Sequence, residues 1–458
     1  MRNSVIVALL ACSVAGTVSG PALANDWEGL SLGIGGAYGM ANGRMHNSVE
    51  VSGISFDQTT SGVPNSGGLF SLSAGYDHAL LGTLVVGAFV DYDFASMGSD
   101  SSYGIGNQLS VGGRLGYLVA PTTLFFSTVG YAHADASNIN PGLGFAGLRG
   151  DIGSFDGYFV GSGVELLIGG GFSLKAEYRY TSYQSRGTKF DIAPLELVTT
   201  VKPEIQTARI SLNYRFGNGK HEPVDNSIPP VTSSWTSPYM GIGAGAGIAD
   251  TRGSTPEDPD AGTGHLGNDG AFLSFNAGYD YQINSRFVAG AFADAAYTNF
   301  GYDSTQKLAF GPFSESATVR NKFENLFMVG GRFGYLTAPD TLLFVSGGYA
   351  NAGLNDTRID IRTNNPFVGS GAISGKLQGK RFSGGFVGGG IETRINDSLS
   401  LKAEYRYVDF GSEILSGSTT DPNIDVVSEK FDPVLQVGML SLNWRLGNPS
   451  PADAASLK

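Results

Sequence analysis

The heptapeptide LKAEYRY occurs at residues 174–180 and again at residues 401–407. In a chain of this length a seven-residue match arises by chance with odds of roughly one in 10⁴, so a duplicated unit is the better explanation. Within the first copy Lys175, Glu177 and Arg179 alternate with leucine, alanine and tyrosine. A period of two predicts a β-strand with one charged face and one apolar face.

The heptapeptide belongs to a longer internal repeat. Its two copies cover residues 25–217 and 235–447. Further matching pairs are AGYDHALLGTLVVGAFVDYDF (74–94) with AGYDYQINSRFVAGAFADAAY (277–297), GGRLGYLVAPTTLFFSTVGYAHA (112–134) with GGRFGYLTAPDTLLFVSGGYANA (330–352), and SLNYRF (211–216) with SLNWRL (441–446). The sequence therefore predicts a tandem duplication of one structural unit.

The composition favours strands and excludes several function classes. Glycine supplies 68 of the 458 residues, about twice the usual share, and only 15% of residues are charged. Phe, Tyr, Val and Thr are plentiful, which is typical of β-structure. The formal net charge of −12, without any run of basic residues, argues against a nucleic-acid partner.

The first 24 residues have the pattern of a secretory signal peptide. Arg2 supplies the positive start, residues 5–14 the apolar core, and Ala22–Ala24 a small-residue cleavage site. Cys12 is the sole cysteine, so the mature chain would lack disulfides, thiol catalysis and cysteine-bound metals. The predicted organisation is a signal peptide (1–24), barrel copy one (25–217), a proline-containing linker (218–234), barrel copy two (235–447) and a tail (448–458).

Each copy contains eight alternating runs of about ten to thirteen residues, a length that suits tilted transmembrane strands of about 9–11 residues. Short connections such as Pro121–Thr122 alternate strictly with long polar ones. The long stretches, expected as exposed loops, are 41–67, 135–155, 184–204, 353–383 and 411–433. Outer-membrane barrels sort their connections in this way, because one rim faces the periplasm and the other faces the outside. We therefore expect an all-β fold, an antiparallel transmembrane β-barrel.

The parity of the charges provides a test of this prediction. Alternate residues of a barrel strand face lipid and lumen, and an arginine on the lipid side at the bilayer midplane costs about 2–4 kcal/mol. Ten strand charges of the first copy share the lumen parity, and seven charges of the second copy stand at matching places. They are Asp77, Asp91, Asp93, Arg114, Glu165, Lys175, Glu177, Arg179, Arg209 and Arg215 in the first copy, and Asp280, Arg332, Glu392, Lys402, Glu404, Arg406 and Arg445 in the second.

This lumen charge network has two interpretations. It could line a pore with a charged constriction, or it could fill the barrel as a packed core in which acidic and basic groups satisfy each other. The first copy carries five acidic and five basic members, and an eight-stranded barrel is just wide enough for side chains to fill. These features favour the packed core.

Several motifs together resemble the small surface antigens of α-proteobacteria, opacity-protein-like members of the OmpA-type barrel superfamily. They are Trp-Glu-Gly at 27–29, GRLGY at 113–117, VGYAHA at 129–134, LKAEYRY and the closing SLNYRF. The resemblance implies an eight-stranded outer-membrane barrel of a Gram-negative bacterium, inserted by the barrel-assembly machinery. It also implies a role in envelope integrity, surface adhesion or host contact rather than catalysis.

Two architectures stay open at this point: two tandem eight-stranded barrels, or one sixteen-stranded barrel with a water-filled lumen. The polar join at 217–234 contains three prolines and favours two barrels. The expected function is a surface barrel with a structural or adhesive role carried by its loops. The alternatives are a porin-type channel and a haem-binding surface protein, although no pair of histidines repeats in both copies.

The expected partners are outer-membrane lipid, lipopolysaccharide, the barrel-assembly machinery and host or matrix ligands at the loops. No nucleic acid, cofactor, metal or enzymatic activity is predicted. The Gly-rich strings lack the following helix and the lysine of a phosphate-binding loop.

Overall fold

The fold was analysed in a computed structural model of the chain. The structure describes residues 24–51, 54–80, 82–98, 103–137, 139–141, 148–192, 195–216, 234–254, 264–365, 369–419 and 428–446. The predicted signal peptide, linker and tail fall almost entirely outside these residues. No helix in the described ranges is long and apolar enough to cross a membrane.

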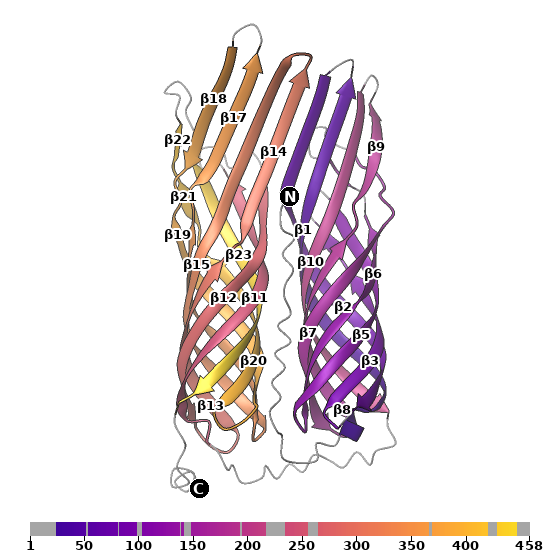
Figure 1. Cartoon of the computed structure of the whole chain (residues 1–458), viewed down its shortest axis with the longest axis vertical. Helices are drawn as coiled ribbons and strands as arrows, with labels where there is room; N and C mark the ends of the chain where they lie inside the picture. The colour runs from indigo at the N-terminus through magenta and orange to yellow at the C-terminus, as the bar shows by residue number, and fades with distance from the viewer. Residues whose placement is uncertain are drawn as a thin grey trace.

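The first copy forms a closed ring of eight long antiparallel strands (Figure 1). In chain order they are β1 (Gly29–Val51), β2 (Ile54–Leu80), β3 (Leu84–Ala95), β5 (Gly104–Ala120), β6 (Thr123–Ala136), β7 (Ser154–Gly169), β8 (Phe172–Tyr183) and β10 (Leu195–Phe216). Each strand pairs with the next, and β1 also pairs with β10 from Leu30–Phe216 to Glu50–Glu196, which closes the ring.

The second copy closes in the same way. Its strands are β11 (Ser237–Ser254), β12 (Gly264–Gln282), β13 (Phe287–Thr298), β15 (Phe313–Ala338), β16 (Thr341–Leu354), β19 (Arg381–Arg394), β20 (Leu399–Phe410) and β23 (Glu429–Arg445). The closing pair is β11 with β23. The prediction of two tandem eight-stranded barrels is therefore confirmed, and the walls of the two barrels stand side by side (Figure 1).

The prediction that the long polar stretches are loops is wrong for most of them. Residues 41–67 continue β1 and β2 far above the barrel wall, and 184–204 form β9 (Arg186–Ile192) and much of β10. Residues 353–383 contain β17 (Thr357–Asn365) and β18 (Gly369–Leu377). Above the membrane a strand no longer needs an apolar face toward lipid, so the alternation that reveals strands in the wall disappears from the sequence.

These extensions form one antiparallel sheet that spans both barrels at their outer rim. Its strand order is β18, β17, β15, β14 (Gly301–Phe310), β2, β1, β10 and β9. The two copies meet where β14 pairs with β2, from Ser304–Thr60 to Phe310–Ile54. We call this element the bridging sheet; it rises across the top of Figure 1. The remaining short elements are η1 (Ala24–Trp27), β4 (Met97–Gly98), β21 (Glu413–Leu415) and β22 (Gly417–Thr419).

Below the bridging sheet the two walls touch at equivalent positions of the repeat. Near the periplasmic rim the hydroxyl oxygens of Thr123 and Thr341 lie 3.0 Å apart, and both residues are fully buried. Val164 and Leu166 have the outward parity expected from the sequence, yet they are 5% and 0% exposed. Leu166 pairs with Thr123, so the second barrel covers this part of the wall in place of lipid.

At mid-height the contact uses polar groups that would be costly in lipid. The hydroxyl of Tyr178 donates to the carbonyl oxygen of Ala246 over 3.1 Å, and the side-chain amide of Gln206 donates to the carbonyl oxygen of Gly247 over 3.2 Å. A Cβ atom at Gly438 would lie 2.5 Å from the Tyr178 ring, so only glycine admits this ring. Gln206 has lipid-facing parity, and its burial against the second barrel explains why it is tolerated there.

Between these contacts the walls stand apart. The space between them measures about 2920 Å³ and is lined mainly by outward apolar side chains such as Phe70, Leu115, Ile242 and Leu343. This cavity has the character of the lipid-facing surface, and it lies outside both lumens.

The threonine contact yields a direct prediction. Replacing both Thr123 and Thr341 with cysteine should give a disulfide within one chain on mild oxidation, because the two hydroxyl oxygens lie 3.0 Å apart. The mature chain would contain no other thiol, since Cys12 lies in the predicted signal peptide. Non-reducing electrophoresis and thiol counting of the folded protein measure the bond. Each single cysteine variant is the matched control, and two free thiols in the oxidised double variant would contradict the contact.

Candidate functional site: the filled barrel lumens

The alternating geometry of the strands directs the predicted charges into the two lumens. Their side chains are at most 8% exposed, except for that of Lys175, which is half-buried. Lumen-facing glycines leave room for them: a Cβ atom at Gly161 would lie 2.8 Å from a Glu177 carboxylate oxygen. Close packing inside a narrow bore is therefore built into the wall.

Four of the first copy's charges form a compact ring near the periplasmic end. The Arg114 guanidinium lies 2.5 Å from an oxygen of Asp77 and 2.5 Å from an oxygen of Glu165. Arg215 lies 2.7 Å and 3.3 Å from the same two carboxylates. Two arginines thus share two carboxylates, and each charge faces two opposite charges.

The second copy repeats this ring with equivalent residues. Arg332 lies 2.5 Å from Asp280 and 2.6 Å from Glu392, while Arg445 lies 2.9 Å and 3.1 Å from these carboxylates. The same four chemical groups therefore occupy the same level of each barrel. We call these sets the charge rings.

A second cluster of charges lies further toward the outer rim. In the first copy Arg179 contacts Asp91 at 2.7 Å and Glu177 at 3.1 Å, and Arg209 contacts Asp93 at 2.8 Å. The remaining predicted charge of this copy, Lys175, lies two residues before Glu177 on the same side of β8.

The second copy keeps only part of that cluster. Arg406 and Lys402 contact Glu404 at 2.8 Å and 3.0 Å, and Arg406 also pairs with Asp294. Asp294 was not among the predicted charges, although it aligns with Asp91 within the matched segments 74–94 and 277–297. That alignment was sufficient to find it.

One ion pair of the first copy is replaced as a unit in the second. By the same alignment Asp93 corresponds to Ala296, and Arg209 corresponds to Met439. Both replacements are apolar and 5% exposed, and both belong to the apolar cluster of the second barrel. Because acid and base are lost together, no charge is left without its partner.

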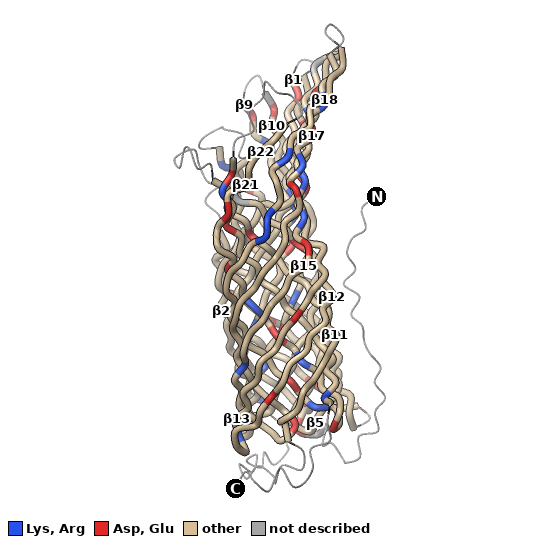
Figure 2. Tube along the Cα trace, turned by 90° about the vertical axis from the view of Figure 1, so that its left-hand side faces the viewer, with Lys and Arg blue, Asp and Glu red and all other residues tan. Residues whose placement is uncertain are grey.

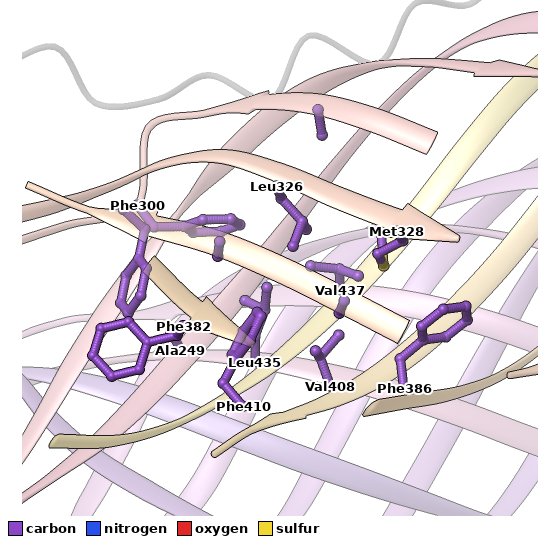
Figure 3. Packing of buried hydrophobic residues seen from close by; sticks show 14 of the residues in the cluster. Ala249, Phe300, Leu326, Met328, Phe382, Phe386, Val408, Phe410, Leu435 and Val437 are labelled. Carbon is purple, nitrogen blue, oxygen red and sulfur yellow. The ribbon is translucent and has the colours of Figure 1, made fainter. Parts of the chain in front are cut away.

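Toward the outer rim each lumen is closed by apolar side chains. In the second barrel one cluster contains Phe382 and Phe386 of β19, Phe410 of β20 and Phe300, which lies between β13 and β14, with aliphatic residues between them (Figure 3). A void beside Phe300 and Phe410 measures about 10 Å³, no more than the smallest volume that holds one water molecule. In the first barrel the equivalent cluster contains Met97, Tyr103, Phe155, Phe159 and Tyr183. These inward aromatic residues were not predicted.

A tryptophan closes each lumen at the periplasmic end. Trp27 and Trp235 are fully buried, and each indole N–H donates to a proline carbonyl of a tight turn. The charge ring holds them from the inside: Arg215 donates to the Trp27 carbonyl oxygen at 2.7 Å, and Arg445 to that of Trp235 at 3.2 Å. Trp27 belongs to the Trp-Glu-Gly motif of the sequence, but its position inside the lumen was not predicted.

Each lumen therefore consists of three stacked layers: a tryptophan plug, a set of paired charges and an aromatic plug. Such an arrangement stabilises a narrow barrel in the way that an apolar core stabilises a soluble domain. Within the part of the chain that the structure describes, no group of three histidine, cysteine or carboxylate side chains is arranged to hold a metal ion.

Comparison with known proteins agrees with this architecture. A family model described as an outer membrane protein beta-barrel domain matches residues 8–216 and, a second time, residues 227–428. The 31 kDa outer-membrane immunogenic protein of Brucella melitensis is 28% identical over 209 residues, which cover 42% of this chain and 79% of that protein. The 22 kDa outer membrane protein of Rhizobium leguminosarum is 32% identical over 173 residues, which cover 37% and 70%.

Solved structures with similar strand arrangements include two outer-membrane proteins that cover one copy and one that covers most of the chain. They are Ail of Yersinia pestis, in complex with a heparin analogue (13% identity, 46% of this chain and 99% of that one, TM-score 0.22), OprG of Pseudomonas aeruginosa (13%, 46% and 96%, 0.28) and the toluene transporter TodX of Pseudomonas putida (12%, 94% and 93%, 0.26). Scores this low carry no conclusion about function.

Proposed function

The chain belongs to the family of outer-membrane protein β-barrel domains, of which it carries two copies in tandem, and from this premise we propose that it is a non-conducting surface protein whose interactions are made by the bridging sheet. Its role would be structural or adhesive, in the envelope of a Gram-negative bacterium. The mature chain would begin near Asn25, after signal-peptide cleavage following Ala24, and the barrel-assembly machinery would insert it.

The filled lumen is the observation that carries this proposal. A water-filled pore needs a continuous polar path, but in each barrel the path from the periplasm meets a buried tryptophan, then paired charges, then packed aromatic rings. The ion pairs leave little net charge to attract a permeating ion. The porin alternative applied above all to a sixteen-stranded ring, and the strand pairings close two smaller ones.

The bridging sheet is the surface left to carry an external role. It is the largest element above the lipid-facing band, and it contains strands from both copies. It also fixes the two barrels relative to each other. A duplicated chain can therefore present one broad outer surface that a single barrel could not.

Conductance measurements test the proposal. The full-length protein, refolded in detergent and added to planar lipid bilayers, should produce no discrete current steps under conditions in which an added porin does. Heat-modifiable mobility of the same sample would establish that it is folded. Stable steps of porin size from the folded protein would overturn the proposal and restore the channel alternative.

A further inference from the structure

The outward face of the bridging sheet gathers basic side chains that are scattered along the sequence. Lys376, Arg358 and Arg320 stand directly opposite one another on β18, β17 and β15, so their side chains share one face. Neighbouring strands lie about 4.8 Å apart, which places the three within about 10 Å. The side chains of Arg320 and Lys376 are 61% and 49% exposed, and Arg358 is exposed. Asp303 lies 3.5 Å from Arg320 and Asp356 lies 3.2 Å from Lys376, and both pairs stay open to solvent.

A bulge decides which face of β15 these residues occupy. Below it, Phe327 is 47% exposed on the lipid-facing side. Asn325 has a positive φ of 44°, and the pairing register shifts between Glu324 and Leu326. The extra residue moves even-numbered positions to the outside. The Lys322 ammonium accordingly lies 5.3 Å from the ring centre of the outward Tyr297.

The same outward face continues the basic character over several rows. Arg362 and Lys307 are both exposed and both lie opposite Ser316 of β15, four residues along that strand from Arg320. The acidic Asp360 lies between these two levels, opposite Thr318. The outward basic residues of this half of the sheet are Lys307, Arg320, Lys322, Arg358, Arg362 and Lys376. Figure 2 shows basic positions on β17 where the sheet rises above the wall. The same face of these four strands carries two acidic residues, Asp303 and Asp360, so basic residues outnumber acidic ones there, a local reversal of sign in a chain of net charge −12.

This basic face begins at the rim of the lipid-facing band. Tyr297, Phe327 and Tyr349 are 65%, 47% and 52% exposed and form an outward aromatic group, as expected at a membrane interface. The Arg381 guanidinium lies 5.5 Å from the Phe327 ring centre, and Lys322 covers Tyr297. Arg320 lies two residues from Lys322 on β15, which is about 7 Å along the strand.

We propose that the outward face of β14, β15, β17 and β18 binds the phosphate groups of the lipopolysaccharide that surrounds the barrel in the outer leaflet. Guanidinium and ammonium groups at headgroup height match phosphate oxygens in charge and hydrogen-bonding capacity. The inference rests on the proposed surface role of the bridging sheet, and it does not depend on whether the lumens conduct.

The position of the basic face favours a membrane glycolipid over a soluble polyanion. The face is continuous with the lipid-facing wall below it, so a lipid whose acyl chains pack on Val329 and Phe327 has its phosphates beside Lys322 and Arg320. A soluble polyanion would have no use for that continuity. The bridging sheet would thereby be held against the membrane surface.

The experiment uses the refolded full-length protein and purified, phosphorylated rough lipopolysaccharide in detergent, with binding followed by thermophoresis. The triple variant Arg320→Gln, Arg358→Gln, Arg362→Gln should bind roughly 100-fold more weakly, because each basic side chain at an anionic membrane surface contributes about fivefold. Enzymatically dephosphorylated lipopolysaccharide should lose a similar factor with the unchanged protein.

The matched control lies on the same sheet. Lys189 and Lys202 lie on β9 and β10, in the other half of the sheet and outside the basic face, so Lys189→Gln, Lys202→Gln should leave the affinity unchanged. Equal affinity of the triple variant would overturn the proposal, as would equal affinity for the dephosphorylated glycolipid. Displacement by heparin at the same concentration as by lipopolysaccharide would overturn it in favour of a soluble polyanion. A protein that conducts and still binds would refute only the closed lumen.

Discussion

Replacing Asp93 with alanine should destabilise the first barrel by about 3 kcal/mol, and replacing Arg209 with methionine in the same chain should restore most of that loss. Arg209 is 8% exposed and lies 2.8 Å from Asp93. Removing one partner of a buried ion pair typically costs about 3–5 kcal/mol, because the remaining charge stays buried without compensation. Asp91 lies 3.7 Å from Arg209 and would still compensate part of its charge. We therefore expect a loss of stability at the lower end of this range.

The rescue is expected because the molecule already contains it. The second barrel has alanine and methionine at the corresponding positions, Ala296 and Met439, and both pack into its apolar cluster. The first barrel has a similar cluster beside Arg209, so a methionine there should bury its side chain against apolar neighbours. Replacing a buried ion pair by apolar residues of similar size is often neutral or stabilising.

Trp27 provides the measurement, since it is fully buried in the first barrel. In a background with Trp235→Phe and Trp444→Phe, urea unfolding followed by tryptophan fluorescence reports on this barrel. The single variant Arg209→Met is the matched control and should also be destabilised, because Asp93 then lacks its nearest base. Strictly additive effects of the two substitutions would contradict the coupling.

The sequence was sufficient to predict the wall of each barrel and the side on which its charges lie. Lipid on the outer face requires every second residue of a wall strand to be apolar, which places charges on the lumen side. Every charge in the predicted network lies on that side. The repeat even contained information that was not used, because Asp294 aligns with Asp91 and pairs with Arg406. Comparing charges copy against copy, including those that are lost, would have found both Asp294 and the exchange at Asp93.

Other features could not be predicted, for physical reasons. Val164, Leu166 and Gln206 have lipid-facing parity but are covered by the second barrel, and no pattern within one copy reveals such a neighbour. Some glycines on the lumen side, such as Gly161, leave space for a long charged side chain. At Gly112 the space is filled by Phe159 instead, whose ring would lie 2.7 Å from a Cβ atom there. Above the membrane the bridging sheet lacks the apolar alternation that identifies strands.

Residues 25–217 alone should fold in detergent to a strand-rich monomer whose electrophoretic mobility changes on boiling. The pairing of β1 with β10 closes this copy over its full length, and every ion pair of its charge ring lies within it.

Without the second copy the first barrel loses its contacts with the neighbouring wall. It keeps all eight of its own strands. The hydrogen bond from Gln206 to Gly247 and the pairing of β2 with β14 would be lost. An outward glutamine would then face detergent, so the half should be less stable than the whole, and Gln206→Leu should recover part of the difference. Residues 235–447 are the matched half, with the same expected behaviour. If neither half folds while the intact chain does, strands must be shared between the copies, and the charges that fill two narrow lumens here would instead line one wide pore.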